Sequence, residues 1–249
     1  MRTGAALAGG LLLIVAAVLV WTDRAVHHVP SFYRQALRVD QKLQERSSNE
    51  FLQQAASLVS EAPKTGPWHA VFTQDQINGW LAVDLVKNHG RLLPAGVSDP
   101  RLQITPGGVT LACQYNSGKI HTVFSLQLEP YLAEPNVVAL RIERARAGAV
   151  PLPLDQILQG FTTAAEKADL QLAWKQTDGD PVALVTLPSL ISDDELLLRL
   201  ETLELREGEL HLAGQTEPYT PPVAGGSNVR QIARQSGISF GPLEKQAEF

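Results

Sequence analysis

Apolar residues follow three different patterns along the chain. Residues 4–21 form a continuous run without charge, residues 32–58 place apolar side chains every three or four positions, and residues 102–142 alternate apolar with polar side chains. These patterns are typical of a membrane-spanning or buried helix, of amphipathic helices and of half-buried strands, respectively. The order of the patterns predicts a helical first part followed by an antiparallel sheet.

The uncharged run from Gly4 to Trp21 predicts a transmembrane helix. At about 1.5 Å per residue it spans roughly 27 Å, close to the roughly 30 Å core of a bilayer. The alternatives are a cleaved secretory signal and a buried core helix. Because residues 20–23 lack the small side chains of a cleavage site, we expect residues 1–24 to be an uncleaved anchor in the cell inner membrane. The main domain is then periplasmic or otherwise extracytoplasmic.

A helical pattern also runs through residues 25–62. Phe32, Ala36, Val39 and Leu43 share one stripe, and the polar run at residues 46–50 interrupts it before it resumes out of phase. The segment is predicted to be either a stalk or a packed amphipathic helix. Two prolines and a glycine at residues 63–67 end it as a linker.

The strongest local signal begins at Thr73. Thr73 and Gln76 have the spacing of a capping box, and Phe72 and Ile77 flank them at the hydrophobic staple positions. A helix is therefore expected to start here. Its buried face consists of Ile77, Trp80, Leu81 and Leu85.

Four consecutive strands follow with short turns between them. Residues 101–115 predict a hairpin around Pro106, and residues 120–128 and 137–146 predict two more strands. Phe124 and Leu126 lie on the apolar side of this arrangement. The pattern indicates an antiparallel meander with one covered face and one wet or ligand-facing side.

A second helical stripe from Leu154 to residue 165 would cover the meander, followed by strands at residues 170–175, 182–187 and 200–213. Residues 193–199 fit a helix or a strand equally. The predicted fold class is therefore α+β, with an N-terminal transmembrane helix and a long amphipathic helix followed by a curved antiparallel meander packed against one or two helices. The domain covers residues 68–215, and residues 216–249 are a flexible tail.

Composition narrows the functional classes. The 249 residues include 21 Lys and Arg against 26 Asp and Glu, a formal charge of −5 that argues against nucleic acid as a partner. A single cysteine excludes an intramolecular disulfide and a thiolate metal cage. No nucleophile elbow, phosphate loop or zinc-helix motif occurs in the chain, so we expect neither an enzyme nor a cofactor or metal.

Two groups of polar residues are candidates for a functional site. His121 and Glu129 share the polar side of the predicted sheet and are the best acid–base pair for a hydrolase, although alternating charges on a solvated sheet have the same pattern. Arg141, Arg144 and Arg146 cluster at one strand end and are candidates for contact with a lipid headgroup or an acidic partner, with ordinary surface charge as the alternative.

Three features together resemble the YpmS-type (DUF2140-like) group of envelope proteins. They are the N-terminal anchor, the segment Phe72–Asn78 that opens the domain and the segment 148–154 that closes the meander into a helix. The resemblance covers about residues 1–170. It implies a membrane-anchored extracytoplasmic domain of unknown activity. A looser similarity is to lipid-binding domains with a helix inside a curved antiparallel sheet.

The leading hypothesis is a membrane-anchored domain that binds an apolar ligand, a lipid, between a helix and the apolar sheet face. The candidate ligand-binding residues are Phe72, Ile77, Trp80, Leu81, Phe124, Leu126, Ile157 and Phe161. A non-enzymatic scaffold for another envelope protein is the second hypothesis, and a hydrolase is the third. The ligand, the partner and the oligomeric state are not determined by the sequence.

Overall fold

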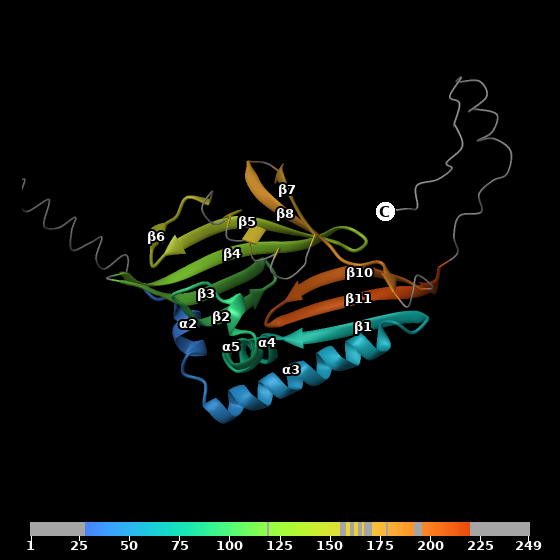
Figure 1. The fold of residues 1–249 in the computed structure, drawn as a ribbon, viewed down its shortest axis with the longest axis horizontal. Helices are drawn as coiled ribbons and strands as arrows, with labels where there is room; N and C mark the ends of the chain where they lie inside the picture. Colours follow the sequence, from blue (N-terminus) through green and yellow to red (C-terminus); the bar gives the residue numbers. More distant parts are fainter. Residues whose placement is uncertain are drawn as a thin grey trace, which may run out of the picture. The chain divides into compact units, whose positions relative to one another are not determined.

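Two antiparallel sheets and a group of helices make up the computed structural model (Figure 1). It describes residues 28–118, 120–154, 158–159, 162–163, 166, 171–177, 179–191 and 196–219. The described residues up to Pro218 belong to one compact unit. The predicted anchor at residues 1–24 and nearly all of the predicted tail at residues 216–249 lie outside the described residues.

The small sheet has four strands in the order β1-β11-β10-β9. These are β1 (Gly66–Thr73), β9 (Leu190–Ile191), β10 (Leu196–Arg206) and β11 (Glu209–Pro218). Residues paired across neighbouring strands lie on the same face of a sheet. The register therefore gives one apolar face, with Trp68, Phe72, Leu200 and Leu212, and one polar face, with His69, Glu204 and His211.

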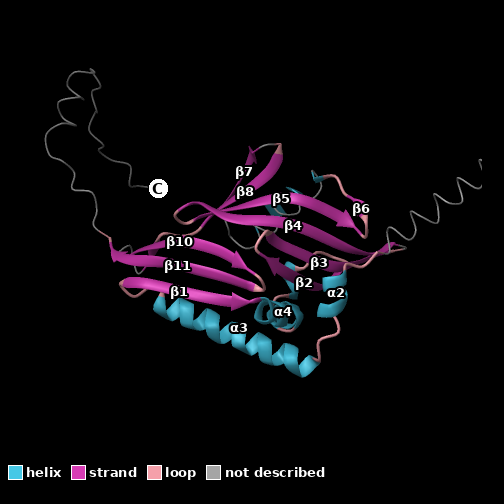
Figure 2. Ribbon diagram, turned by 180° about the vertical axis from the view of Figure 1, so that it is seen from behind, coloured by secondary structure: helices cyan, strands magenta, loops and turns pink. Residues whose placement is uncertain are grey.

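Helix α3 lies along β1 of the small sheet, whereas α2 and α4 contact β2 (Val97–Thr105) of the large sheet (Figure 2). The structure describes five helices before β2. They are α2 (Ser31–Ala36), α3 (Gln41–Glu61), α4 (Gln74–Ala82), α5 (Asp84–Asn88) and the 3-10 helix η1 (Gly90–Leu92). The predicted capping box is confirmed, because Thr73 Oγ1 accepts from Gln76 N at 3.2 Å and Gln76 Oε1 accepts from Thr73 N at 2.9 Å.

Helices α3 and α4 cross at Gly79. A Cβ atom built there would lie 2.6 Å from Ser48 N and 2.7 Å from Ser47 Cβ, so only glycine fits this approach. Ser47 and Ser48 are themselves buried. The polar run at residues 46–50, which the sequence pattern took as an interruption, therefore lies inside a continuous helix of 21 residues, with its two small side chains against α4.

The large sheet has the order β2-β3-β4-β5-β8-β7, with β6 paired to β5. Its strands are β2 (Val97–Thr105), β3 (Gly108–Ser117), β4 (Ile120–Glu134), β5 (Val137–Ala147), β6 (Val150–Pro151), β7 (Gln171–Thr177) and β8 (Asp180–Thr186). The hairpins predicted from alternation are present. Their register separates an apolar face from a polar face.

Helix α2 packs on one end of the polar face. Tyr33 is fully buried there against Ala112 and Val123. Its hydroxyl donates to the carbonyl oxygen of Asp99 at 2.7 Å, at a point where β2 bulges and Asp99 has a φ of 50°. Burial, together with the nearby Asp99, raises the pKa of the Tyr33 phenol, so this hydroxyl stays a donor.

Asn78 closes the outer edge of β2. From α4, its side chain accepts from Leu102 N at 2.7 Å and donates to Leu102 O at 2.8 Å. Gln74 Oε1 accepts from Ile104 N at 2.8 Å, and Gly208 N donates to Ile104 O at 3.1 Å. Side chains and a turn thus replace the missing strand at this edge.

Asn136 joins the two sheets through hydrogen bonds between its side-chain amide and the backbone of β10. It sits at the turn between β4 and β5 with a φ of 63° and is 5% exposed. Its side chain accepts from Leu200 N at 2.6 Å and donates to Leu198 O at 2.6 Å. Beside it, Leu132 and Val138 of the large sheet pack on the buried cluster of Ala62, Trp68 and Leu200.

The predicted fold class is wrong. The structure is mostly antiparallel β-sheet, with 52% of it in strands, rather than a helical first part followed by a single meander. The strands form two sheets because β1 lies before the meander and pairs with β11 at the far end of the domain. Among the described residues, no helix is both long and apolar enough to cross a membrane.

Candidate functional site

The apolar face of the large sheet has half-buried side chains beside fully buried ones such as Ile142 and Ala183. The strand register places Leu111, Cys113, Phe124, Leu126, Leu140 and Trp174 on it. All six side chains are of intermediate exposure. Phe124 stacks on Tyr115 with ring centroids 4.7 Å apart. Burial raises the pKa of the Cys113 thiol to about 11.

A hollow of about 560 Å³ opens beside this face, where the helical residues of the 154–166 segment meet β7 and β8. It is lined by Leu154, Leu158, Trp174, Lys175, Gln176, Gly179 and Pro181. Trp174 Nε1 donates to Thr162 Oγ1 at 3.0 Å, which ties the sheet to that segment. The hollow therefore has apolar walls on two elements and one cationic side chain.

The candidate ligand-binding residues do not form one site. Phe72 lies on β1, and its ring centroid is 5.3 Å from that of Phe51 on α3. Trp80 of α4 contacts the other side of Phe51, with centroids 5.6 Å apart. This group, with Ile77 and Leu81 on the same helix α4, belongs to the helical layer beside the small sheet, whereas Phe124 and Leu126 lie on the large sheet. The remaining candidates, Ile157 and Phe161, lie outside the described residues.

The three arginines of β5 lie on the polar face of the large sheet. Arg141 forms an ion pair with Glu129 at 3.1 Å, and its guanidinium carbon is 5.9 Å from the ring centroid of Tyr131. The side-chain Nε of Arg141 is buried and has no hydrogen-bond partner among the described residues. Arg144 and Arg146 are exposed, opposite Gln127 and Ser125.

The predicted acid–base pair is not assembled. His121 Nδ1 lies 2.8 Å from Asn116 Oδ1, while Glu129 pairs with Arg141. His121 and Glu129 are eight residues apart on one strand, a separation of roughly 26 Å. Proton transfer between them is therefore excluded by distance.

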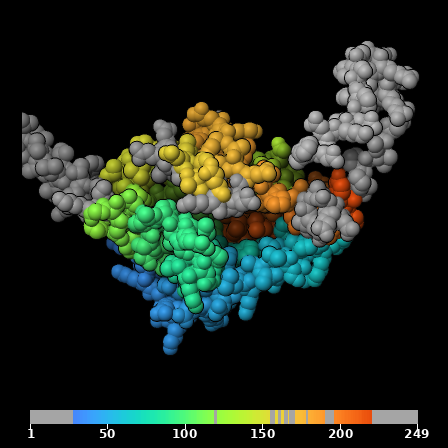
Figure 3. Space-filling model, in the orientation of Figure 1, coloured from blue at the N-terminus to red at the C-terminus, as the bar shows by residue number. Residues whose placement is uncertain are grey.

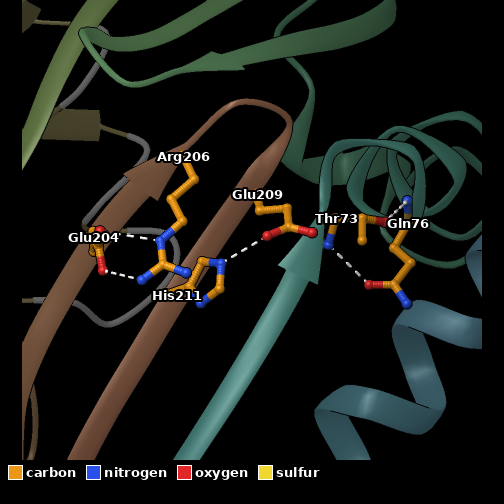
Figure 4. A network of polar contacts seen from close by, with 6 residues as sticks. All are labelled: Thr73, Gln76, Glu204, Arg206, Glu209 and His211. Atoms are coloured by element: carbon orange, nitrogen blue, oxygen red, sulfur yellow. Dashed lines mark hydrogen bonds and ion pairs between the residues drawn. The ribbon is translucent and has the colours of Figure 1, made fainter.

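Polar pairs also line the outer face of the small sheet, next to the capping box of α4 (Figure 4). Arg206 donates from two nitrogens to Glu204 at 2.9 and 3.0 Å, and His211 Nε2 lies 2.7 Å from Glu209 Oε2. The hydrogen bond from Arg206 lowers the pKa of the Glu204 carboxyl and raises that of the guanidinium. Each group already has its partner, so this cluster is explained as surface ion pairing.

A cleft that the sequence analysis missed lies between α2, α3, α4 and β2. Its volume is about 240 Å³, and its lining includes Phe32, Val39, Leu43, Gln103 and Arg101. Arg101 is only 5% exposed. It follows the bulge in β2 and precedes the alternating Leu102 and Ile104, so its position in the pattern looked like an ordinary solvent-facing one. The adjacent Asp99-Pro100 pair, which cannot continue a regular central strand, was the available signal.

The described residues contain no group of three or more His, Cys, Asp or Glu side chains placed to hold a metal ion. Within this part of the chain, two features could bind a ligand. One is the apolar sheet face with its hollow, and the other is the cleft that contains the buried Arg101. Searches against protein families, curated proteins and solved structures find no match to this chain, so the function is argued from these two features alone.

Proposed function

We propose that the protein binds an apolar ligand, the acyl chain of a lipid, on the apolar face of the large sheet beside the helical residues Leu154, Leu158 and Thr162. The observation that carries the proposal is the hollow of about 560 Å³ lined by Leu154, Leu158 and Trp174. Its volume falls in the range of about 300 to 1,000 Å³ that small-molecule sites occupy.

The energetics favour a chain-like ligand. Each methylene removed from water contributes about 0.8 kcal/mol, so an acyl chain gains affinity in proportion to the length that it buries. On the same face of the sheet, Phe124, Leu126 and Leu140 of β4 and β5 are also half-buried apolar residues. Binding of this kind needs no catalytic group. Among the residues that line the hollow, Lys175 is the one with a charged side chain.

Binding is tested on the purified full chain with the neutral fluorescent probe N-phenyl-1-naphthylamine, followed by displacement with monoolein. Leu158 lines the hollow, whereas the next residue, Gln159, is exposed and does not line it, so Leu158→Glu and Gln159→Glu place the same charge inside and outside the hollow. We expect Leu158→Glu to weaken probe binding tenfold or more because it buries a carboxylate in the site. Gln159→Glu should leave binding unchanged.

A second matched pair guards against a folding defect. Leu126 faces the apolar side and Gln127 the polar side of β4, so Leu126→Glu and Gln127→Glu repeat the comparison within the sheet. Circular dichroism establishes which variants are folded. If the wild-type chain does not bind the probe, or if a folded Leu158→Glu variant binds it as well as Gln159→Glu does, the proposal is wrong.

A further inference from the structure

The cleft between α2, α3, α4 and β2 is a second site with different chemistry. Its cation, Arg101, is 5% exposed and lines the cleft. Arg101 Nη1 donates to the carbonyl of Pro100 at 2.7 Å. In the part of the chain that the structure describes, this is the only hydrogen bond of the side chain, and no carboxylate lies within 4.0 Å of it.

An unpaired buried guanidinium is costly. Burial lowers the pKa of Arg101, and the negative charge of Asp99 only partly opposes this effect. Arginine has five N–H donors in a planar fork that matches a carboxylate or phosphate. No nitrogen of Arg101 is among the described buried side-chain atoms without a partner, so those that do not bond to Pro100 reach solvent in the cleft. Gln35 and Gln103 also line the cleft, and their amide groups make no hydrogen bond to other described residues. An oxyanion in the cleft would replace water as the partner of the remaining Arg101 N–H groups, whereas the Gln35 amide is exposed to solvent.

Apolar side chains nearer to solvent also line the cleft, with polar ones such as Gln44 and Ser47 between them. Exposure rises from 5% at Arg101 to 38% at Val39 and 51% at Leu43. A ligand that fits this gradient has its anionic end at the deep end and an alkyl part at the mouth. Asp75 is exposed and also lines the cleft, and its charge disfavours a doubly charged phosphate relative to a carboxylate.

We propose that this cleft binds the carboxylate of a single-chain amphiphile such as a medium-chain fatty acid, with Arg101 as the anion-binding residue and Phe32, Val39 and Leu43 in contact with the alkyl chain. The site is independent of the proposed hollow, because it lies at the β2 end of the sheet on the face that α2 covers.

The test compares decanoate, decan-1-ol and acetate as probes for the full chain by isothermal titration calorimetry. Decanoate should bind at least tenfold more tightly than decan-1-ol, which shares its chain, and than acetate, which shares its charge. Arg101→Met keeps the length of the side chain and removes the charge. This variant should bind decanoate no better than decan-1-ol.

Arg34→Met is the matched control, because Arg34 is exposed on α2, does not line the cleft and carries the same charge. It should retain the preference for decanoate. Arg101→Met should also melt at the same or a higher temperature than the wild type, since an unpaired buried charge is replaced by an apolar side chain. A lowered melting temperature would identify Arg101 as a structural residue and contradict the proposal.

The two proposals fail separately. Equal binding of decanoate and decan-1-ol by the wild type, or unchanged decanoate affinity in Arg101→Met, overturns the carboxylate site whatever the neutral probe does. Conversely, the Leu158→Glu variant should keep its preference for decanoate over decan-1-ol even where it loses the neutral probe.

Discussion

The small and large sheets carry the same alternation of apolar and polar residues, but single positions on their apolar faces are buried to different depths. In the small sheet, Trp68, Phe72 and Leu200 are 9%, 6% and 4% exposed. In the large sheet, Phe124 and Leu126 remain of intermediate exposure, although Ile104 and Ile142 on the same face are 1% and 0% exposed. Alternation alone therefore predicts that a face is apolar and does not predict how completely it is covered.

Helix α3 accounts for the deep burial of Trp68 and its neighbours in the small sheet. Helix α3 packs against β1, and Leu58 and Ala62 at its C-terminal end reach the Trp68 cluster. The hydroxyl of Thr216 donates to the carbonyl of Ala62, which fixes that end of the helix to β11. Trp68 also lies so close to β11 that Gly214 has no room for a side chain. The space-filling view shows α2 and α3 in blue along one margin, with the strands of the large sheet in green to yellow beyond them (Figure 3).

The largest effect should come from truncating the same residue type in the two sheets. Phe72→Ala is expected to lower the free energy of unfolding by about 4 kcal/mol, because it leaves a cavity in a filled core. Phe124→Ala should lower it by only about 1 to 2 kcal/mol, since part of that ring is already hydrated. Urea unfolding measures both. Equal losses would show that the two apolar faces are equally covered.

The two asparagines that close sheet edges offer a smaller effect. Asn136→Ala removes two hydrogen bonds at a 5% exposed position and should lower the free energy of unfolding by about 3 kcal/mol. Asn78→Ala, at a more hydrated edge, should lower it by about 2 kcal/mol. Asn88→Ala is the exposed control, with an expected change below about 0.5 kcal/mol. A loss for Asn136→Ala no larger than that of the control would mean that this turn does not hold the sheets together.

The smallest effect concerns pH and the hydration of the large sheet. The pKa of the Cys113 thiol is raised from 9.0 to about 11 in the folded chain. This contribution to stability is complete below the pKa of the unfolded thiol and is lost as the pH rises toward the folded value. From about pH 8 to about pH 10, the wild type should therefore lose about 1 kcal/mol more stability than Cys113→Ala does. If the free energy of unfolding depends on pH in the same way in both proteins, the Cys113 thiol is exposed to solvent and the prediction is wrong.

Local signals in the sequence were sufficient for local structure. Thr73 and Gln76 predicted a helix start because both capping bonds lie within four residues. The meander followed from strict alternation and short turns. The pairing of β1 with β11 was not predictable in this way, since residues 66–73 contact residues 209–216 and no pattern within either segment identifies its partner.

Polar residues at two places in the chain are buried, although the pattern of apolar and polar residues around them does not show it. Ser47 and Ser48 were treated as a break in the helical stripe, yet their small side chains are what allow α4 to approach at Gly79. The alternation of Leu102 and Ile104 does not indicate that Arg101 is buried, because α2, which covers that part of the sheet, lies far away in the sequence. A polar residue is assigned to the surface by default. Only the tertiary contacts show which ones are inside.

The edge contact of Asn78 also bears on how the folded protein ages. Asn78 is followed by Gly79, and a glycine offers little steric resistance when its own backbone nitrogen attacks the preceding amide. Loss of the amide would leave a carboxylate, which accepts but does not donate, facing the carbonyl of Leu102. The helical backbone of α4 holds the nitrogen away from that attack, so the same fold that depends on this amide also preserves it chemically.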